Sequence, residues 1–243
     1  MKIAIPSHKR IKGLKTRTYD LLMRHGFDEN DIYIFVSPEC YKEYKEEFKN
    51  VILSKNNILD TRNHIIEYFD EGEEIVEMDD DVLDIKTCEK YIKPESVNDL
   101  KLIFKESFEK SKGGLWGFNS VIRNDNANVP VDNTDKIGIQ KVSIVNSCIG
   151  YTNRKDIKLS VSEKEDFERV LIYFHKKIPI LKRRMYGIHT RYWTNAGGLQ
   201  DRYNTEERKK VQEISANKLI EMYPEDCKKV YRKKNNICDL RFM

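Results

Sequence analysis

Three adjacent aspartates, Asp79 to Asp81, directly follow an apolar segment, Ile75–Met78. If that segment is a strand of an open parallel sheet, the aspartates lie at the carboxyl edge, where such sheets bind ligands. Neighbouring carboxylates repel one another unless a positive charge lies among them, and Mg²⁺ or Mn²⁺ accepts their oxygens while leaving positions for a diphosphate. The pattern therefore predicts a divalent metal site. Its plainer alternative is an acidic turn that caps the next segment.

Two further segments place basic and hydroxyl groups where a strand ends or a helix begins. The first expected strand ends in Pro6-Ser7, and His8-Lys9-Arg10 follows. This arrangement suits the base and phosphates of a nucleotide, or else forms a solvated turn. The second segment, Asp60-Thr61-Arg62-Asn63, lies at an expected helix start. Its arginine suits phosphate or planar groups, although Asp60 is equally explained as a helix cap.

These residues require a scaffold of alternating strands and helices, and the first half of the sequence shows one. Short apolar runs alternate with helical patterns over short connections, which predicts βαβ units and an open, mostly parallel, doubly wound sheet with flanking helices. The expected strands are Lys2–Ile5, Ile32–Val36, Val51–Leu53 and Glu74–Met78, and the expected helices are Lys15–His25, one beginning at Ser37-Pro38, and Asp60–Phe69.

The second half is less regular. A helix is expected from a Ser96 cap, with Asp99 completing a capping box, to Gly113. Beyond it we expect strands at Leu115–Phe118 and Ile137–Val145, a long polar loop at Arg123–Asp135, a helix at Glu163–Lys176, an irregular stretch at Met185–Tyr203 and a helix at Thr205–Tyr223.

Length and composition bound the class of protein. A chain of 243 residues without a repeat or a Pro/Gly/Ser linker is expected to form a single domain. No apolar run approaches the roughly 20 residues of a membrane span, and no signal-peptide core follows Met1, so we expect a cytoplasmic protein with no membrane partner. Five scattered cysteines without a CxxC pair favour a reducing compartment over a disulfide framework or a zinc site.

Charge is divided unevenly along the chain, whose formal net charge is +4. Residues 181–243 hold 15 Lys or Arg against 8 Asp or Glu, whereas the preceding 180 residues hold 29 against 32. A basic final quarter suggests a polyanionic partner or a clamp for a diphosphate. Solvated helix faces would explain the same charge without any partner.

The order of these segments resembles the donor half of GT-A glycosyltransferases over about residues 2–200. A strand ends in Pro-Ser, a helix carries Arg-Asn, and a later strand leads into a DxD motif formed by Asp79 and Asp81. More narrowly, the chain is similar to the TET-associated glycosyltransferases, a clade that includes phage and kinetoplastid enzymes acting on hydroxymethylated DNA bases. The similarity rests on IPSHKR with Thr16 and Thr18, on the MDDD element and on NAGGLQ at Asn195–Gln200.

The resemblance implies a role for each segment. The implied donor contacts are Pro6, Ser7, Arg10, Arg62, Asn63, Asp79 and Asp80, and the implied metal ligands are Asp79, Asp81 and the later His189. Asp166, in the pair Glu165-Asp166, is the implied general base. Ser162 and Glu165 also fit a capping box, and a lone histidine is more often structural. Gly197-Gly198 would allow close backbone approach to a sugar, or would merely form a turn.

The resemblance also implies a reaction. We expect metal-dependent transfer of a sugar, glucose from UDP-glucose, to a hydroxyl on modified DNA, either a hydroxymethylated pyrimidine or a sugar already attached to it. About 1–112 would form the nucleotide-sugar half and about 113–243 the acceptor half with its basic end. Three alternatives stay open: a GT-A enzyme acting on a glycan or protein, a metal-dependent nucleotidyltransferase or nuclease, and a non-catalytic nucleic-acid-binding module. The oligomeric state is not predicted.

Overall fold

The computed structural model describes residues 1–88, 93–122, 134–190, 205–232 and 237–243. Within them, nine strands form one sheet in the order β3-β2-β1-β4-β8-β6-β9-β5, with β7 paired to β9. The strands are β1 (Lys2–Ser7), β2 (Ile32–Val36), β3 (Val51–Leu53), β4 (Glu74–Met78), β5 (Val82–Thr87), β6 (Leu115–Ile122), β7 (Lys136–Gly138), β8 (Val145–Thr152) and β9 (Ile180–Thr190).

Helical crossovers make the first half of the sheet parallel. Strands β3, β2, β1 and β4 run parallel because helices join each to the next in sequence. These connections contain α1 (Ile11–Lys15), α2 (Thr18–Arg24), the short 3₁₀ helix η1 (Glu29–Asp31), α3 (Pro38–Lys45) and α4 (Ile58–Tyr68). In the second half, β8 is antiparallel to β4 and β6, whereas β6 and β9 are parallel. The α/β class with a central sheet and flanking helices is confirmed.

Alternating side chains of the strands build a separate core on each face of the sheet. On β1, Ile3 and Ile5 pack with α1, α2 and α5 (Leu100–Ser111), whereas Ala4 packs with α4 and α6 (Glu165–His175). The two-residue period of a strand produces this division. Both faces are therefore covered, and ligands can reach the sheet only at the ends of its strands.

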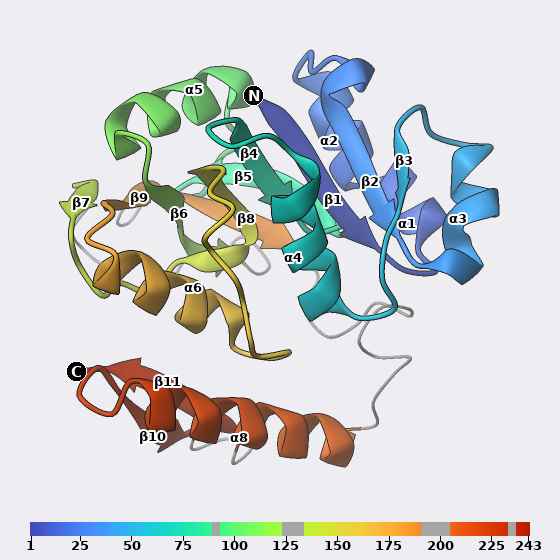
Figure 1. Cartoon of the computed structure of the whole chain (residues 1–243). Coiled ribbons are helices and arrows are strands. Elements are labelled where there is room, and N and C mark those ends of the chain that lie inside the picture. Colours follow the sequence, from blue (N-terminus) through green and yellow to red (C-terminus); the bar gives the residue numbers. More distant parts are fainter. Residues whose placement is uncertain (89–92, 123–133, 191–204, 233–236) are drawn as a thin grey trace.

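The C-terminal residues add a layer beside α6 (Figure 1). Helix α8 (Thr205–Met222) packs on an antiparallel hairpin of β10 (Cys227–Tyr231) and β11 (Cys238–Phe242). Val161 and Leu171 of the main body share a small apolar core with Leu219 and Leu240 of this layer. We call α8, β10 and β11 the C-terminal layer. No helix in the described parts of the chain is long and apolar enough to cross a membrane.

Two expected helix starts are wrong because other contacts use the capping residues. Helix α5 begins after Asp99, whose side chain accepts a hydrogen bond from Leu102 N at 2.8 Å, whereas Ser96 bonds Asp84. Helix α6 begins at Glu165 after Lys164, which has a positive φ of 67° and makes no side-chain cap. The capping box expected at Ser162 is therefore absent.

Other boundaries also differ from expectation. The helix expected at Lys15–His25 divides into α1 and α2 around Arg17, and the strand expected at Ile137–Val145 divides into β7 and the start of β8. Residues 185–190, expected to be irregular, continue β9, because β5 and β6 pair with them. The rest of that stretch and most of the loop expected at Arg123–Asp135 lie outside the described residues.

Candidate active site

The carboxyl ends of β1 and β4, the start of α6 and the C-terminal layer enclose a cleft of about 770 Å³. The fold brings most of the sequence-predicted site together here, although the residues lie far apart along the chain. Of those residues, the cleft is lined by Pro6, Ser7, Arg10, Arg62, Asp79, Asp80, Asp81 and Asp166.

Hydrogen bonds from two other elements, β8 and α2, shape the aspartate turn after β4. The Asp79 N–H donates to the Ser147 carbonyl of β8 at 3.0 Å. On the other side, the Thr18 hydroxyl donates to the Asp79 carbonyl at 2.7 Å and accepts from Val82 N at 2.9 Å. Because Thr18 opens α2 and Ser147 belongs to β8, tertiary packing sets the direction of each aspartate.

Asp80, the middle aspartate, points inward and supports two other cleft residues. It is 5% exposed, and its oxygens accept from Ser7 Oγ at 2.6 Å and from Arg10 Nη1 at 3.0 Å. Burial raises the pKa of Asp80, while Arg10 and Ser7 oppose that rise. Asp80 therefore holds Ser7 and Arg10 in place at the cleft.

Asp79 and Asp81 point toward the cleft, with side chains 33% and 17% exposed. Asp79 pairs with Arg62 Nη2 at 3.1 Å, and Asp81 accepts from Thr190 Oγ1 at 3.0 Å. Burial raises the pKa of Asp79 to about 6, and Asp81 adds to this rise although Arg62 opposes it. The turn therefore carries more negative charge than its arginines offset.

A divalent cation fits this turn through two protein ligands. Mg²⁺ characteristically binds one or two carboxylates and completes its shell with phosphate oxygens and water. Asp79 and Asp81 supply hard oxygen donors of that kind. Across the described ranges, no three His, Cys, Asp or Glu side chains form a preassembled metal cluster, so the remaining ligands would come from substrate and solvent.

Arg62 connects the aspartate turn with the start of α6. It is 3% exposed and lies 2.7 Å from Glu77 Oε2, 3.1 Å from Asp79 Oδ1 and 3.4 Å from Glu165 Oε1. Glu77 also pairs with Arg169 at 3.0 Å and accepts from the Tyr151 hydroxyl. Although burial opposes ionisation, Arg169 and Arg62 hold the pKa of Glu77 below its usual value. Arg62 thus binds carboxylates on both sides of the cleft floor.

Helix α6 presents two acidic side chains at its first turn. Glu165 accepts from Asn146 Nδ2 at 2.9 Å and pairs with Arg62, so it is a structural bridge and not the capping partner expected from the sequence. Asp166 follows it and lines the cleft. Burial and the charge of Glu165 raise the pKa of Asp166 to about 7. A carboxylate with this pKa is suited to accept a proton at neutral pH.

Solved structures of S. aureus TarS are similar to the chain. TarS 1-349 in complex with UDP-GlcNAc aligns over 90% of this chain and 67% of its own, with a TM-score of 0.54 and 12% identity. The same TarS fragment in complex with UDP gives 0.53, and a longer TarS chain gives 0.51 with 40% of its length covered. No family model and no curated protein match the sequence. The chain has a GT-A-like glycosyltransferase fold.

Two expected site residues lie elsewhere in this GT-A-like fold. The Asn63 amide bonds the backbone N–H and carbonyl of Leu159, each at 2.9 Å, and does not line the cleft. His189 pairs with Asp84 across β5 and β9, whereas Thr190, one position along, contacts Asp81. Because successive strand side chains point to opposite faces, Thr190 faces the aspartate turn, whereas His189 does not line the cleft. Asn195–Gln200, including Gly197-Gly198, lie outside the described residues.

Several residues that line the cleft or support its lining were missed by sequence reasoning. Glu77 carried a readable signal, since it is a lone acidic residue in an apolar strand. Thr190, Ser147 and Asn146 carried none, because β8 and β9 reach the aspartates only through sheet pairing. The basic C-terminal residues are also less available than expected, since Arg208, Lys229 and Arg232 pair with acidic side chains.

Proposed function

We propose that this chain is a glycosyltransferase that moves a sugar from a UDP-sugar to an acceptor hydroxyl. The observation that carries the proposal is the placement of two partly exposed aspartates and a third carboxyl group with a raised pKa around one cleft of a GT-A-like fold. A donor and an acceptor can meet in a cleft of this size. The TarS structures contain UDP-GlcNAc and UDP, which supports uridine as the donor nucleotide.

The donor end is assigned to β1, α4 and the aspartate turn. Pro6 and Ser7 lie at the end of β1, and Arg10 and Arg62 provide positive charge for the nucleotide. Asp79 and Asp81 would hold Mg²⁺ or Mn²⁺. That ion would offset the charge of the leaving diphosphate and so would lower the free energy of the transition state by several kcal/mol. Asn63 and His189 are omitted from this assignment because neither lines the cleft.

The transfer step is assigned to Asp166. Its carboxylate accepts the proton of the acceptor hydroxyl while that oxygen bonds to the anomeric carbon. The bond from this carbon to the diphosphate oxygen breaks, and UDP leaves with the electron pair. General-base catalysis of this kind contributes about 10²–10⁴-fold. Glu165 keeps the pKa of Asp166 high and, through Arg62, links the base to the donor site.

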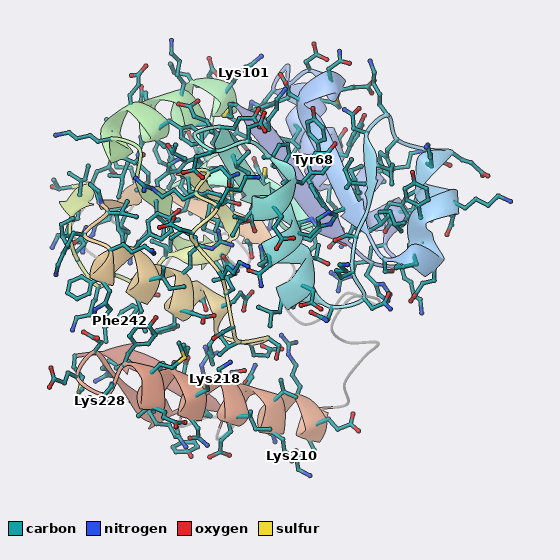
Figure 2. All side chains as sticks on the ribbon, in the orientation of Figure 1. Tyr68, Lys101, Lys210, Lys218, Lys228 and Phe242 are labelled. Carbon is teal, nitrogen blue, oxygen red and sulfur yellow. The ribbon has the colours of Figure 1, made fainter. Side chains whose placement is uncertain are left out.

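For the acceptor we propose a hydroxyl on modified DNA, with glucose as the transferred sugar. The support is the resemblance of IPSHKR and MDDD to the TET-associated glycosyltransferases, together with the basic residues 181–243. Figure 2 shows Lys210 of α8 pointing away from the main body, where a phosphate backbone could pass. Lysines at such a surface bind phosphates without reading the sequence.

Radiolabelled UDP-sugars test the donor chemistry. Wild-type protein with Mn²⁺ should release UDP and transfer label, whereas Asp81→Asn should do neither. Asp20→Asn is the matched control, because Asp20 is an exposed acid paired only with Arg24 within α2. Equal turnover by Asp81→Asn and Asp20→Asn would refute the proposed metal role. Release of pyrophosphate from nucleoside triphosphates, or DNA cleavage without a sugar donor, would instead support the nucleotidyltransferase or nuclease alternative.

A further inference from the structure

The cleft extends past Asp166 to a wall supplied by the C-terminal layer. Arg208 and Gln212 of α8 line it, together with Asp239 and Phe242 of β11. Phe242 packs against Phe167 of α6 with 4.7 Å between ring centroids, and Figure 2 shows it where this layer faces the main body. Since the donor end is assigned to β1 and β4, this wall lies where the acceptor would bind.

Three cations at this wall are paired with acidic side chains. Arg208 lies 3.1 Å from Glu163, and Lys164 lies 2.8 Å from Asp239. Arg232 pairs with the same Asp239 at 2.6 Å. These ion pairs offset the charge of three cations at the wall, whereas Arg241 of β11 lines the same cleft and is exposed.

Two carboxamide oxygens at the cleft lack a hydrogen-bond donor among the described residues: Asn146 Oδ1 and Gln212 Oε1. Each of these side chains directs its NH₂ group to a carboxylate, from Asn146 to Glu165 at 2.9 Å and from Gln212 to Glu163 at 3.4 Å. Gln212 is only 5% exposed. A buried polar atom without a partner is costly, so its presence in a binding cleft indicates a ligand that supplies the donor.

The acceptor end is therefore rich in hydrogen-bond acceptors. Its carboxylates and the two amide oxygens accept hydrogen bonds, and a fitting ligand must donate several. A sugar does so through its hydroxyl groups, whereas a pyrimidine edge presents acceptors beside its donors and a phosphate presents acceptors only. The apolar side of the Phe167–Phe242 pair can cover the apolar face of a sugar ring, as in many small-molecule sites.

We propose that this wall is a subsite for a saccharide acceptor, with Asn146 and Gln212 as specificity residues that accept hydrogen bonds from its hydroxyls. The inference rests on the proposed function and narrows it. The hydroxyl that Asp166 deprotonates belongs to a sugar, such as one already attached to a modified base, and not to the hydroxymethyl group of a pyrimidine.

The test compares acceptors after donor chemistry has been measured by itself. Hydrolysis of UDP-glucose and UDP-GlcNAc without acceptor measures the donor site alone. If the protein neither hydrolyses these donors nor transfers a sugar, both the proposed function and the saccharide subsite are refuted. With donor turnover present, methyl glucosides and DNA carrying glucosylated hydroxymethylcytosine should accept label, and DNA carrying only hydroxymethylcytosine should not. Transfer to the unglucosylated DNA but to no saccharide would overturn the inference and leave the proposed function standing.

Variants locate the subsite. Gln212→Ala should raise the acceptor KM at least about 10-fold and leave the donor KM and donor hydrolysis unchanged. Asn146→Ala should also raise the acceptor KM, but because Asn146 bonds Glu165 its donor hydrolysis is not used as a control. Asn217→Ala is the matched control, since Asn217 is an exposed carboxamide on the same helix. Melting temperatures identify a variant that fails to fold, and the more conservative Gln212→Asn then replaces it. An unchanged acceptor KM in folded variants, or equal changes in donor and acceptor KM, would overturn the assignment.

Discussion

Replacing Arg62 by methionine should destabilise the protein strongly, because one buried guanidinium serves three carboxylates. The change keeps an unbranched apolar stem and removes the guanidinium contacts to Glu77, Asp79 and Glu165. Glu77 is fully buried and would keep only Arg169 and Tyr151 as partners. Removal of one member of a buried ion pair typically costs about 3–5 kcal/mol, since the other charge is left without compensation.

Chemical denaturation of matched variants measures this cost. Arg62→Met should lose about 3–5 kcal/mol of unfolding free energy, whereas Arg24→Met, in an exposed pair with Asp20, should lose about 0.5 kcal/mol or less. Adding Glu77→Gln to Arg62→Met should deepen the loss, because the fully buried Arg169 then loses its carboxylate partner. A loss below about 1 kcal/mol for Arg62→Met, or recovery of stability in the double variant, would refute the proposed network.

Three further predictions concern chemistry, pH and the acceptor. Asp81→Asn should abolish UDP-sugar turnover without lowering the melting temperature, and full wild-type activity in excess chelator would contradict this. Asp166→Asn should lower kcat about 10²–10⁴-fold with little change in donor affinity, and wild-type kcat/KM should fall as pH drops below about 7, because the base must be ionised. The raised pKa also means that the stabilising contribution of Asp166 is complete in acid and is lost as pH rises through about 7. The unfolding free energy of Asp166→Asn should therefore exceed that of the wild type by about 2 kcal/mol at pH 8, after allowance for solvent screening, and match it near pH 4. If DNA binds the basic residues of α8, a plot of log affinity against log salt concentration should have a slope of about −0.9 for each phosphate contacted, and Lys210→Ala should flatten that slope by about one unit. An affinity that does not change with salt would exclude DNA binding at this surface.

The fold class and the donor motifs could be predicted from local patterns. The first four expected strands appear in β1 to β4, and Asp79–Asp81 follow β4 at the edge of the sheet. These features depend on short-range periodicity and on the rule that parallel strands end at a common ligand edge. Neither requires knowledge of which distant segments touch.

The roles of individual site residues depended on contacts that are remote in sequence. Asp80 points inward because Ser7 and Arg10 bond it, and Asn63 leaves the cleft because Leu159 accepts its amide. Thr190, and not His189, contacts Asp81 because the pairing of β9 with β5 sets which side chain faces the turn. A shift of one residue in a strand reverses the direction of every side chain, so sequence spacing alone cannot decide such a question.

The acceptor side was decided almost entirely by tertiary structure. Residues 181–243 showed one expected helix and an excess of basic residues, which suggested a surface for a polyanion or a clamp for a diphosphate. Packing of α8 and β11 against α6 instead pairs Arg208 and Arg232 with acidic neighbours and turns Gln212 into the cleft. Composition shows how much charge a segment carries, whereas the pairing of that charge depends on which surfaces are buried together. The C-terminal layer joins the rest of the protein through contacts between residues about 50 to 90 positions apart, which local sequence patterns do not reveal.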